Sequence, residues 1–74
     1  MVQEQGGFTV RFARRAAGLT QAELAAKVGV SRQTIISIER GDYAPSVYLA
    51  LGIARKLNAT VEELFGAGTQ EDEQ

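Results

Sequence analysis

Four side chains between residues 32 and 37 have the chemistry needed to read the edges of DNA bases. Arginine donates two hydrogen bonds to guanine, glutamine pairs with adenine in a similar bidentate way, and an aliphatic group contacts the methyl group of thymine. If Ile35 and Ile38 face a core, a helix through this stretch turns the four side chains toward solvent. The exposed face of any amphipathic helix holds similar residues, so this pattern alone leaves base reading and simple solvation both open. The four residues are Arg32, Gln33, Ser37 and, in part, Ile36.

Five further residues could hold the phosphates of a DNA backbone. Gln21 and Ser31 stand at the N-terminal ends of two expected helices, where unpaired N–H groups and the helix dipole favour an anion. Arg11, Arg40 and Tyr43 carry long hydrogen-bond donors near the ends of this helix pair. Each group also has a purely structural alternative. Ser31 could be a helix cap, Gln21 could make a local hydrogen bond, and Tyr43 could pack in a loop.

Arg14 and Glu39 form a candidate pair of a different kind. Arg14 lies one turn before Gly18, where the first expected helix ends, and Glu39 lies near the end of the helix that carries the candidate base readers. In a compact bundle an ion pair between them would join these two helices. Such a pair contributes little net stability but can fix geometry. Two independent surface charges are the alternative.

The segment that contains the candidate base readers, residues 20–41, predicts two short helices joined by a tight turn. Thr20 is a good N-cap for the first helix, and Glu23 completes a capping box. Gly29 can take the positive φ that the turn requires, and Ser31 caps the second helix. A helix pair of this spacing is a helix-turn-helix, which lays its second helix in the major groove of DNA.

Three further helices are predicted, which makes the fold an all-α, compact bundle of five short helices. The apolar residues between the expected caps recur at the three- and four-residue spacing of a helix face. The three helices cover residues 8–17 with Thr9 as the cap, residues 47–57 after the cap Ser46, and residues 61–65 after the cap Thr60. The composition then divides the chain into a disordered arm (residues 1–7), a DNA-binding domain (residues 8–66, with its helix-turn-helix at 21–40) and a disordered acidic tail (residues 67–74).

The net charge of −1 hides an uneven distribution. Glu71, Asp72 and Glu73 lie in the tail, whereas residues 11–40 carry six basic and two acidic groups. A local basic face matters more for phosphate binding than the overall charge does.

The residue types that the sequence lacks narrow its function classes. Without Cys or His there is no disulfide, no thiolate or imidazole metal ligand and no histidine base. The acidic residues show no acid–base spacing, so we expect no enzyme, no metal and no cofactor. No apolar run approaches the ~20 residues of a membrane span, and no signal peptide is evident, so we expect no membrane partner and a cytoplasmic location.

The segment GLTQAELAAKVGVSRQTIISIERG resembles the helix-turn-helix of the phage repressor/Cro (Xre) family, and most closely its short single-domain regulators. The pattern SRQTI-x-x-IE-x-G-x-Y-x-PS-x-x-LA-x-x-IA is matched from residue 31 to residue 54, and ELF follows at residues 63–65. The resemblance implies a lambda-repressor-like domain that binds a palindromic operator as a dimer. It also implies base contacts from Arg32, Gln33 and Ser37, and a helix-joining role for Arg14 and Glu39. By the same likeness, the residues that approach phosphates are Gln21, Ser31, Arg40 and Tyr43.

A homodimer is also expected on physical grounds, because two half-sites about one helical turn apart multiply the affinity of one recognition helix. The last predicted helix offers Val61, Leu64 and Phe65 as a dimer surface. Closing the core of a small domain is the alternative for Val61 and Leu64. Phe65, next to the tail, is the stronger interface candidate.

We therefore expect a sequence-specific transcriptional regulator that binds double-stranded DNA and represses by occupying its operator. The alternative is an antitoxin or another protein-interaction module that also binds its own promoter. In that case the acidic tail would be the segment that orders on a protein partner. Co-purification of such a partner would favour the alternative.

Overall fold

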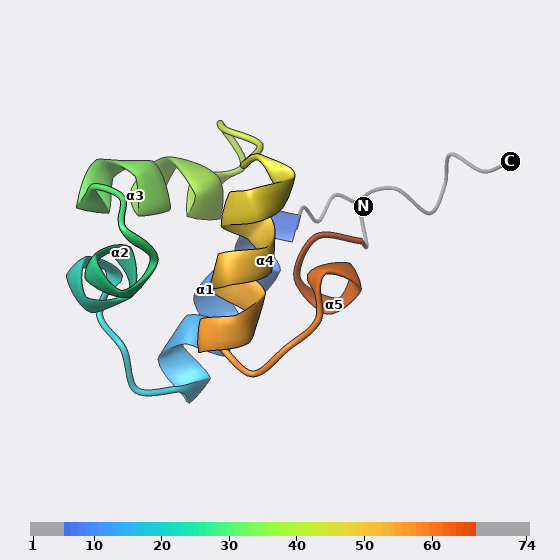
Figure 1. Ribbon diagram of the computed structural model, residues 1–74, viewed down its shortest axis with the longest axis horizontal. Helices are drawn as coiled ribbons and strands as arrows, with labels where there is room; N and C mark the ends of the chain where they lie inside the picture. The colour runs from blue at the N-terminus through green and yellow to red at the C-terminus, as the bar shows by residue number, and fades with distance from the viewer. Residues whose placement is uncertain (1–5, 67–74) are drawn as a thin grey trace, which may run out of the picture.

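The structure, a computed structural model, describes residues 6–66, which fold into five helices (Figure 1). The helices are α1 (Gly6–Ala16), α2 (Gln21–Val28), α3 (Arg32–Arg40), α4 (Val47–Lys56) and α5 (Val61–Phe65). Residues 6–66 contain no strand, and the predicted all-α bundle of five short helices is confirmed. The expectations for residues 1–5 and for the tail at 67–74, including its role in binding a protein, lie outside the described residues.

The last four helices each begin after the hydroxyl residue that the sequence predicts as the cap. Thr20 Oγ1 accepts a hydrogen bond from the Glu23 N–H at 3.0 Å, and the Glu23 carboxylate accepts one from the Thr20 N–H at 2.8 Å. This capping box satisfies two N–H groups that the helix itself leaves unpaired. Thr60 and Glu63 form the same arrangement at the start of α5. The other two caps are Ser31 of α3 and Ser46 of α4.

The turn between α2 and α3 depends on Gly29. This residue has a φ of 77°, in the left-handed region where an ordinary side chain costs roughly 1–2 kcal/mol. The N–H groups of Gly29 and Val30 both donate to the carbonyl oxygen of Ala25, which closes the end of α2. Ala25 is itself buried, and its small side chain lets α3 pass close to α2.

The first helix begins at Gly6, two residues before the predicted start at Phe8. Thr9 therefore lies in the first turn of α1 and is not its cap. Helix α1 packs against both α3 and α5, and this packing offsets the low helix propensity of its two glycines, about 1 kcal/mol each relative to alanine. Gly18 takes the left-handed conformation after α1, as predicted for a helix stop.

Every helix contributes to one hydrophobic core. Helix α1 packs against α3 and α5, α2 packs against α3 and α4, and α4 packs against α5. Because Ile35 and Ile38 point into this core, the opposite side of α3 faces outward. The buried cluster consists of Val10, Leu24, Ala25, Ile35, Ile38, Ile53, Ala54, Leu57 and Leu64.

Candidate nucleic-acid interface

The outward side of α3 presents the two residues with the strongest base-reading chemistry. Arg32 and Gln33 are exposed in the first turn of the helix, where a recognition helix carries base-contacting groups. Ile36 and Ser37 are half-buried, so they offer less of their side chains to a ligand. All four predicted base readers therefore reach the surface, with the greatest exposure at the N-terminal end of α3.

A buried ion pair holds α1 against α3. Arg14 Nε donates to Glu39 Oε2 at 2.6 Å, and Arg14 Nη2 donates to Glu39 Oε1 at 3.2 Å. The two side chains are 8% and 2% exposed, so each buried charge depends on the other. Arg14 Nη1 also donates to the carbonyl oxygen of Leu19 at 2.7 Å, which ties the turn after α1 to the pair. Arg14 and Glu39 thus meet as a helix-joining pair and are not separate surface charges.

Gln21, at the start of α2, belongs to the same network. Its Nε2 donates to Glu39 Oε1 at 3.1 Å, so the Glu39 carboxylate links α1, α2 and α3. A glutamine amide nitrogen has two N–H groups, and this bond uses one of them. The hydrogen bond of Gln21 is therefore made to another helix, 18 positions along the chain, and is not the local bond considered as its alternative role. It holds the side chain in place while leaving a donor for a second acceptor.

A hollow of about 500 Å³, here called the basic hollow, opens around this network between α1, the start of α2 and α3. Four exposed arginines line it, together with Gln21, Ile36 and the buried pair. The charge of Arg14 is balanced by Glu39, whereas the four exposed arginines add positive charge from two helices to one opening. They are Arg11 and Arg15 of α1 and Arg32 and Arg40 of α3.

Arg15 is the one charged residue in the lining of the basic hollow that the sequence analysis does not predict as a contact. It is exposed and follows Arg11 by four residues on α1. Side chains four residues apart on a helix lie side by side. The four-residue spacing from Arg11 is the sequence feature that indicates a phosphate contact for Arg15, because a phosphate held by Arg11 would also lie within reach of Arg15.

Two of the predicted phosphate contacts lie outside the basic hollow. Ser31 caps α3, since its Oγ accepts a hydrogen bond from the Thr34 N–H at 3.1 Å, and it remains exposed at the start of the helix. Tyr43 is exposed on the loop after α3 and lines an apolar groove on another part of the surface. The structure therefore gathers Arg11, Gln21 and Arg40 in one place but keeps these two residues apart from them.

Arg40 makes an ion pair at the edge of the basic hollow. Its Nε lies 3.4 Å from Asp42 Oδ2, and both side chains are mostly exposed. Exposed pairs of this kind contribute at most ~1 kcal/mol. A phosphate can therefore replace Asp42 as the partner of Arg40 at little cost.

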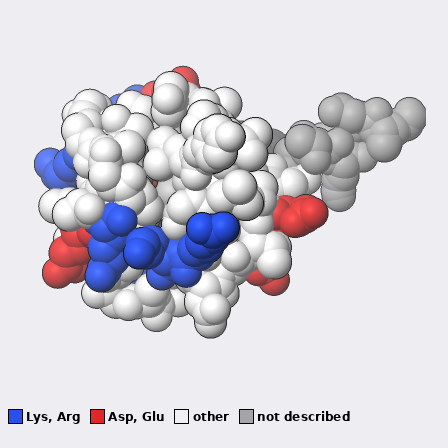
Figure 2. Space-filling view, in the orientation of Figure 1, with Lys and Arg blue, Asp and Glu red and all other residues white. Residues whose placement is uncertain are grey.

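The described residues carry a positive balance that the whole chain lacks. Residues 6–66 hold all eight of the Lys and Arg residues but only five of the nine Asp and Glu residues. Figure 2 shows a short band of basic side chains low on the face it draws, on the α2 and α4 side of the molecule and below α3, with acidic side chains toward the edges. The positive balance of residues 6–66 favours a polyanionic partner.

Within residues 6–66, no group of three or more His, Cys, Asp or Glu side chains could hold a metal ion. Over the same range, no helix has both the length and the apolar character needed to cross a bilayer. The hydrogen-bond donors that line the basic hollow are arginine, amide and hydroxyl groups, which suit phosphates and base edges.

The α5 residues predicted as a dimer surface separate into two groups. Leu64 is 1% exposed and belongs to the core, so it has no surface to offer a partner. This is a correction to the prediction, and it arises because α5 has little more than one turn with which to cover the core. Val61 and Phe65 are half-buried and line the apolar groove, which has a volume of about 950 Å³.

Comparison of the sequence with known proteins matches most of the described chain. The helix-turn-helix family model HTH_3 matches residues 10–64. An uncharacterised HTH-type transcriptional regulator of Archaeoglobus fulgidus is 54% identical over 56 residues, which cover 76% of this chain and 80% of the relative.

Two solved structures share the arrangement of the helices. The crystal structure of the P22 c2 repressor in complex with synthetic operator 9T matches with a TM-score of 0.81 and 27% identity, covering 85% of this chain and 96% of the repressor. The crystal structure of SinR, a master regulator for biofilm formation, in complex with DNA matches with a TM-score of 0.74 and 30% identity, covering 80% of this chain and 95% of SinR. Both of these similar proteins were therefore solved with DNA bound.

Proposed function

We propose that this chain, which belongs to the helix-turn-helix family HTH_3, represses transcription as a homodimer on a palindromic operator. It is a transcriptional regulator of the phage repressor/Cro (Xre) type that its sequence resembles. Proteins of this family are regulators and not enzymes. The observation that carries the proposal is that α3 exposes Arg32 and Gln33 beside three further exposed arginines, and that Arg32 lines the same hollow as these three. Base readers beside phosphate holders are the two kinds of contact that sequence-specific binding needs.

In the proposed complex α3 lies in the major groove with its N-terminal end against the base edges. Arg32 reads guanine and Gln33 reads adenine, because their donor and acceptor groups match those bases. Ile36 and Ser37 lie one turn further along the helix and are half-buried, so a smaller part of each side chain can contact a base. Ile36 suits a thymine methyl group.

Phosphate contacts surround this reading helix. Arg11 and Arg15 approach the backbone from α1, while Gln21 and Ser31 add donors at the starts of α2 and α3. Arg40 and Tyr43 extend the contacts beyond the end of α3. Each arginine that neutralises a phosphate releases counterions, so binding by this set depends steeply on salt.

The buried network sets the angle at which these contacts meet DNA. Glu39 of α3 accepts hydrogen bonds from Arg14 of α1 and from Gln21 of α2, and so locks the two phosphate-holding helices onto the reading helix. Neither Arg14 nor Glu39 has an exposed charge to spare for DNA. We therefore assign them a positioning role.

Repression by occupancy is the mode of action that this domain supports. The P22 c2 repressor, to which the chain is similar, was crystallised on a synthetic operator. A dimer bound over a promoter blocks polymerase without further chemistry, and a cytoplasmic location gives it access to DNA. Two half-sites about 34–36 Å apart, one helical turn, are the expected operator geometry.

Selection of DNA from a random-sequence duplex pool by the purified chain tests the proposal. The expected product is an inverted repeat whose affinity falls by roughly 10³-fold or more between 50 and 200 mM salt, as neutralisation of several phosphates requires. Failure to enrich any sequence, or binding that is insensitive to salt, would contradict it. Enrichment of a single, unrepeated site would retain DNA reading but exclude the palindromic dimer.

A further inference from the structure

A second basic surface lies outside the basic hollow, at the C-terminal ends of α2 and α4. It consists of Lys27 in the last turn of α2 and of Arg55 and Lys56 in the last turn of α4. All three side chains are exposed, and none of them forms an ion pair with another residue of the range 6–66. Figure 2 shows basic side chains as a short band on this side of the molecule. The contacts proposed for the operator leave these three charges unused.

The two helix ends meet because α2 packs against α4. A Cβ added at Gly52 would lie 3.9 Å from Val28 Cγ1, so the residue next to Lys27 touches the middle of α4. Tyr48 and Lys56 each lie four residues from Gly52, and residues at this spacing are neighbours on one side of a helix. Lys27, Tyr48 and Lys56 therefore border the same stretch of surface.

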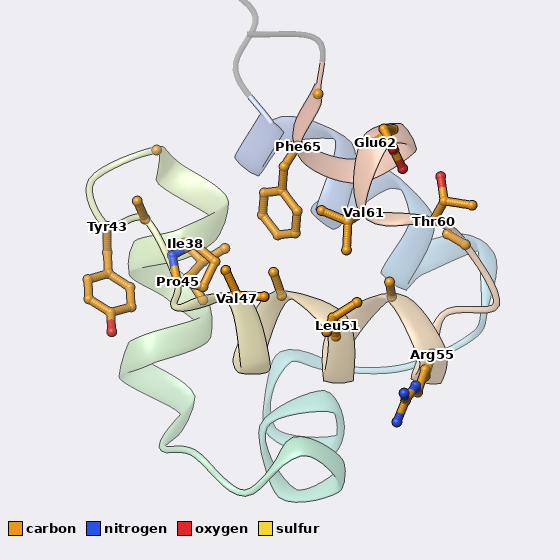
Figure 3. Close-up of a pocket in the computed structure, with 16 residues that line it drawn as sticks. Ile38, Tyr43, Pro45, Val47, Leu51, Arg55, Thr60, Val61, Glu62 and Phe65 are labelled. Carbon is orange, nitrogen blue, oxygen red and sulfur yellow. The ribbon is translucent and has the colours of Figure 1, made fainter. Parts of the chain in front are cut away.

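Tyr48 gives this surface an aromatic ring. Its side chain is 87% exposed and lines neither the basic hollow nor the apolar groove. Arg55 lies seven residues further along α4, about two turns, and so on the same side of the helix. Arg55 also lines the apolar groove, but Figure 3 shows its side chain pointing away from α5. The charge of Arg55 is therefore available beside Lys56.

Helix dipoles explain only part of this arrangement. The last turn of a helix favours cations, which accounts for the positions of Lys27, Arg55 and Lys56 within their own helices. It does not account for an almost fully exposed tyrosine in the first turn of α4, or for the meeting of two basic helix ends beside it. An aromatic ring next to several cations is the combination with which proteins bind single-stranded nucleic acid.

We propose that this surface, here called the aromatic-basic face (Lys27, Tyr48, Arg55 and Lys56), binds a single strand of DNA or RNA. Tyr48 stacks on an unpaired base, and the three cations contact the neighbouring phosphates. A duplex offers phosphates too, but neighbouring bases cover the base faces, so the ring favours a single strand. The inference goes beyond the proposed function, because none of these residues belongs to the proposed operator contacts. At a promoter the strand is either melted DNA or a transcript.

Substitution of the aromatic ring tests the stacking. The measurement is fluorescence anisotropy of the full chain with labelled oligo(dT) and oligo(rU) strands of about 15 nucleotides. Tyr48→Ala should raise the dissociation constant about tenfold, the effect of losing one stacked base, whereas Tyr48→Phe keeps the ring and should stay within about threefold of the native value. Tighter binding of oligo(rU) would identify a transcript as the ligand, and tighter binding of oligo(dT) a melted DNA strand.

The matched control for the ring is Phe12→Ala. Phe12 is 71% exposed on α1, so this variant removes a similarly exposed aromatic side chain from another helix. Its dissociation constant for either strand should stay within about threefold of the native value, because no base stacks on Phe12 in the proposed complex. Circular dichroism is used to verify the fold of each variant.

The charges are tested by the salt dependence of strand binding. Lys27→Gln and Lys56→Gln should each lower the slope of log affinity against log salt by about 0.7, the value for one phosphate contact on a single strand. Arg15→Gln, in the basic hollow, should leave this slope unchanged. The selected operator should show the reverse pattern, with a lower slope for Arg15→Gln and none for Lys56→Gln.

Three results would overturn the proposal. They are the absence of binding to both strands at millimolar protein concentration, an effect of Tyr48→Phe or Phe12→Ala as large as that of Tyr48→Ala, and a larger effect of Arg15→Gln than of Lys56→Gln on strand binding. Since these measurements contain no duplex, each of these results leaves the selection of an operator sequence intact. Failure of that selection with the expected strand results would instead remove the operator proposal and keep the aromatic-basic face.

Discussion

The basic hollow and the apolar groove are built in opposite ways from the same five helices. The basic hollow opens around a buried polar network in which Arg14, Glu39 and Gln21 fix the relative positions of three helices. The apolar groove is lined mainly by aliphatic and aromatic side chains. Among the described residues, two charged side chains without an ion pair line it, Arg55 and Glu62. Helix α3 takes part in both, with Arg32 and Arg40 in the hollow and Ile38 at the groove.

This difference matches the role that we propose for each surface. Reading base edges requires donors and acceptors at fixed positions, and hydrogen bonds are directional enough to hold them there. Joining two copies requires mainly that apolar area be removed from water, which is a non-directional effect. In the proposed complex the polar network lies under the surface that reads DNA, and the uncovered apolar side chains lie on the surface that joins the two copies.

The largest effect should come from breaking the network beneath the basic hollow. Arg14→Ala leaves the Glu39 carboxylate buried without its ion partner, and such a change costs about 3–5 kcal/mol. Chemical denaturation followed by circular dichroism measures this loss. Because small domains have only about 5–15 kcal/mol in total, this loss is a large fraction of the free energy of unfolding.

The matched control replaces both members of the pair. Arg14→Met with Glu39→Met removes both charges while keeping similar volume, and should recover most of the lost stability. It should still bind DNA poorly, because Gln21 loses its acceptor and the helices lose their fixed angle. A double variant that binds DNA as well as the native chain would show that the network has no positioning role.

A smaller effect, confined to binding, should follow from changing a base reader. Gln33→Ala removes an exposed amide from α3 and touches no core contact, so the free energy of unfolding should stay within about 0.5 kcal/mol. Its affinity for the selected operator should fall by ~1–3 kcal/mol, with relaxed preference at one base pair. Measurement on operators that differ at each position checks this, and an equal loss on every sequence would show that Gln33 does not read bases.

Arg15→Gln should weaken binding in a different pattern. Arg15 lines the basic hollow and faces no base in the proposed complex, so its loss should reduce affinity equally on all sequences. The slope of log affinity against log salt should fall by about one unit, because one phosphate is no longer neutralised. An unchanged slope would exclude Arg15 from the phosphate contacts. Lys56→Gln, an exposed position that lines neither the basic hollow nor the apolar groove, serves as a control for the loss of one positive surface charge.

The fold was largely predictable from the sequence because its helix boundaries are marked by local chemistry. Thr20, Ser31 and Thr60 accept hydrogen bonds from the N–H groups expected of caps, and Gly29 takes the expected left-handed turn. The predicted start of α1, at Phe8, was wrong by two residues. We attribute this to the packing of α1 against α3 and α5, because no local cap marks its start.

The sites were less predictable because they combine residues from several helices. The pairing of Arg14 with Glu39 could be predicted through the family resemblance. The hydrogen bond from Gln21 to Glu39 could not, because it depends on the angle between α2 and α3. Leu64 could not be separated from Phe65 by spacing, because a helix of five residues has no clear periodicity. The apolar groove depends on exposed Val47 and Leu51, whose types alone predict burial.

The smallest effect should come from strengthening the scaffold between the two surfaces. Gly52 lies in the middle of α4, and a Cβ added there would meet Val28 Cγ1 at 3.9 Å, an ordinary van der Waals contact. Gly52→Ala should therefore raise the free energy of unfolding by up to ~1 kcal/mol through helix propensity. Neither surface includes Gly52, so operator affinity and the dimer dissociation constant should both stay unchanged. As a control, Gly29→Ala, at a position with left-handed backbone, should lower the free energy of unfolding by a similar amount. If Gly52→Ala also lowered it, α2 and α4 would pack too closely for a methyl group at position 52.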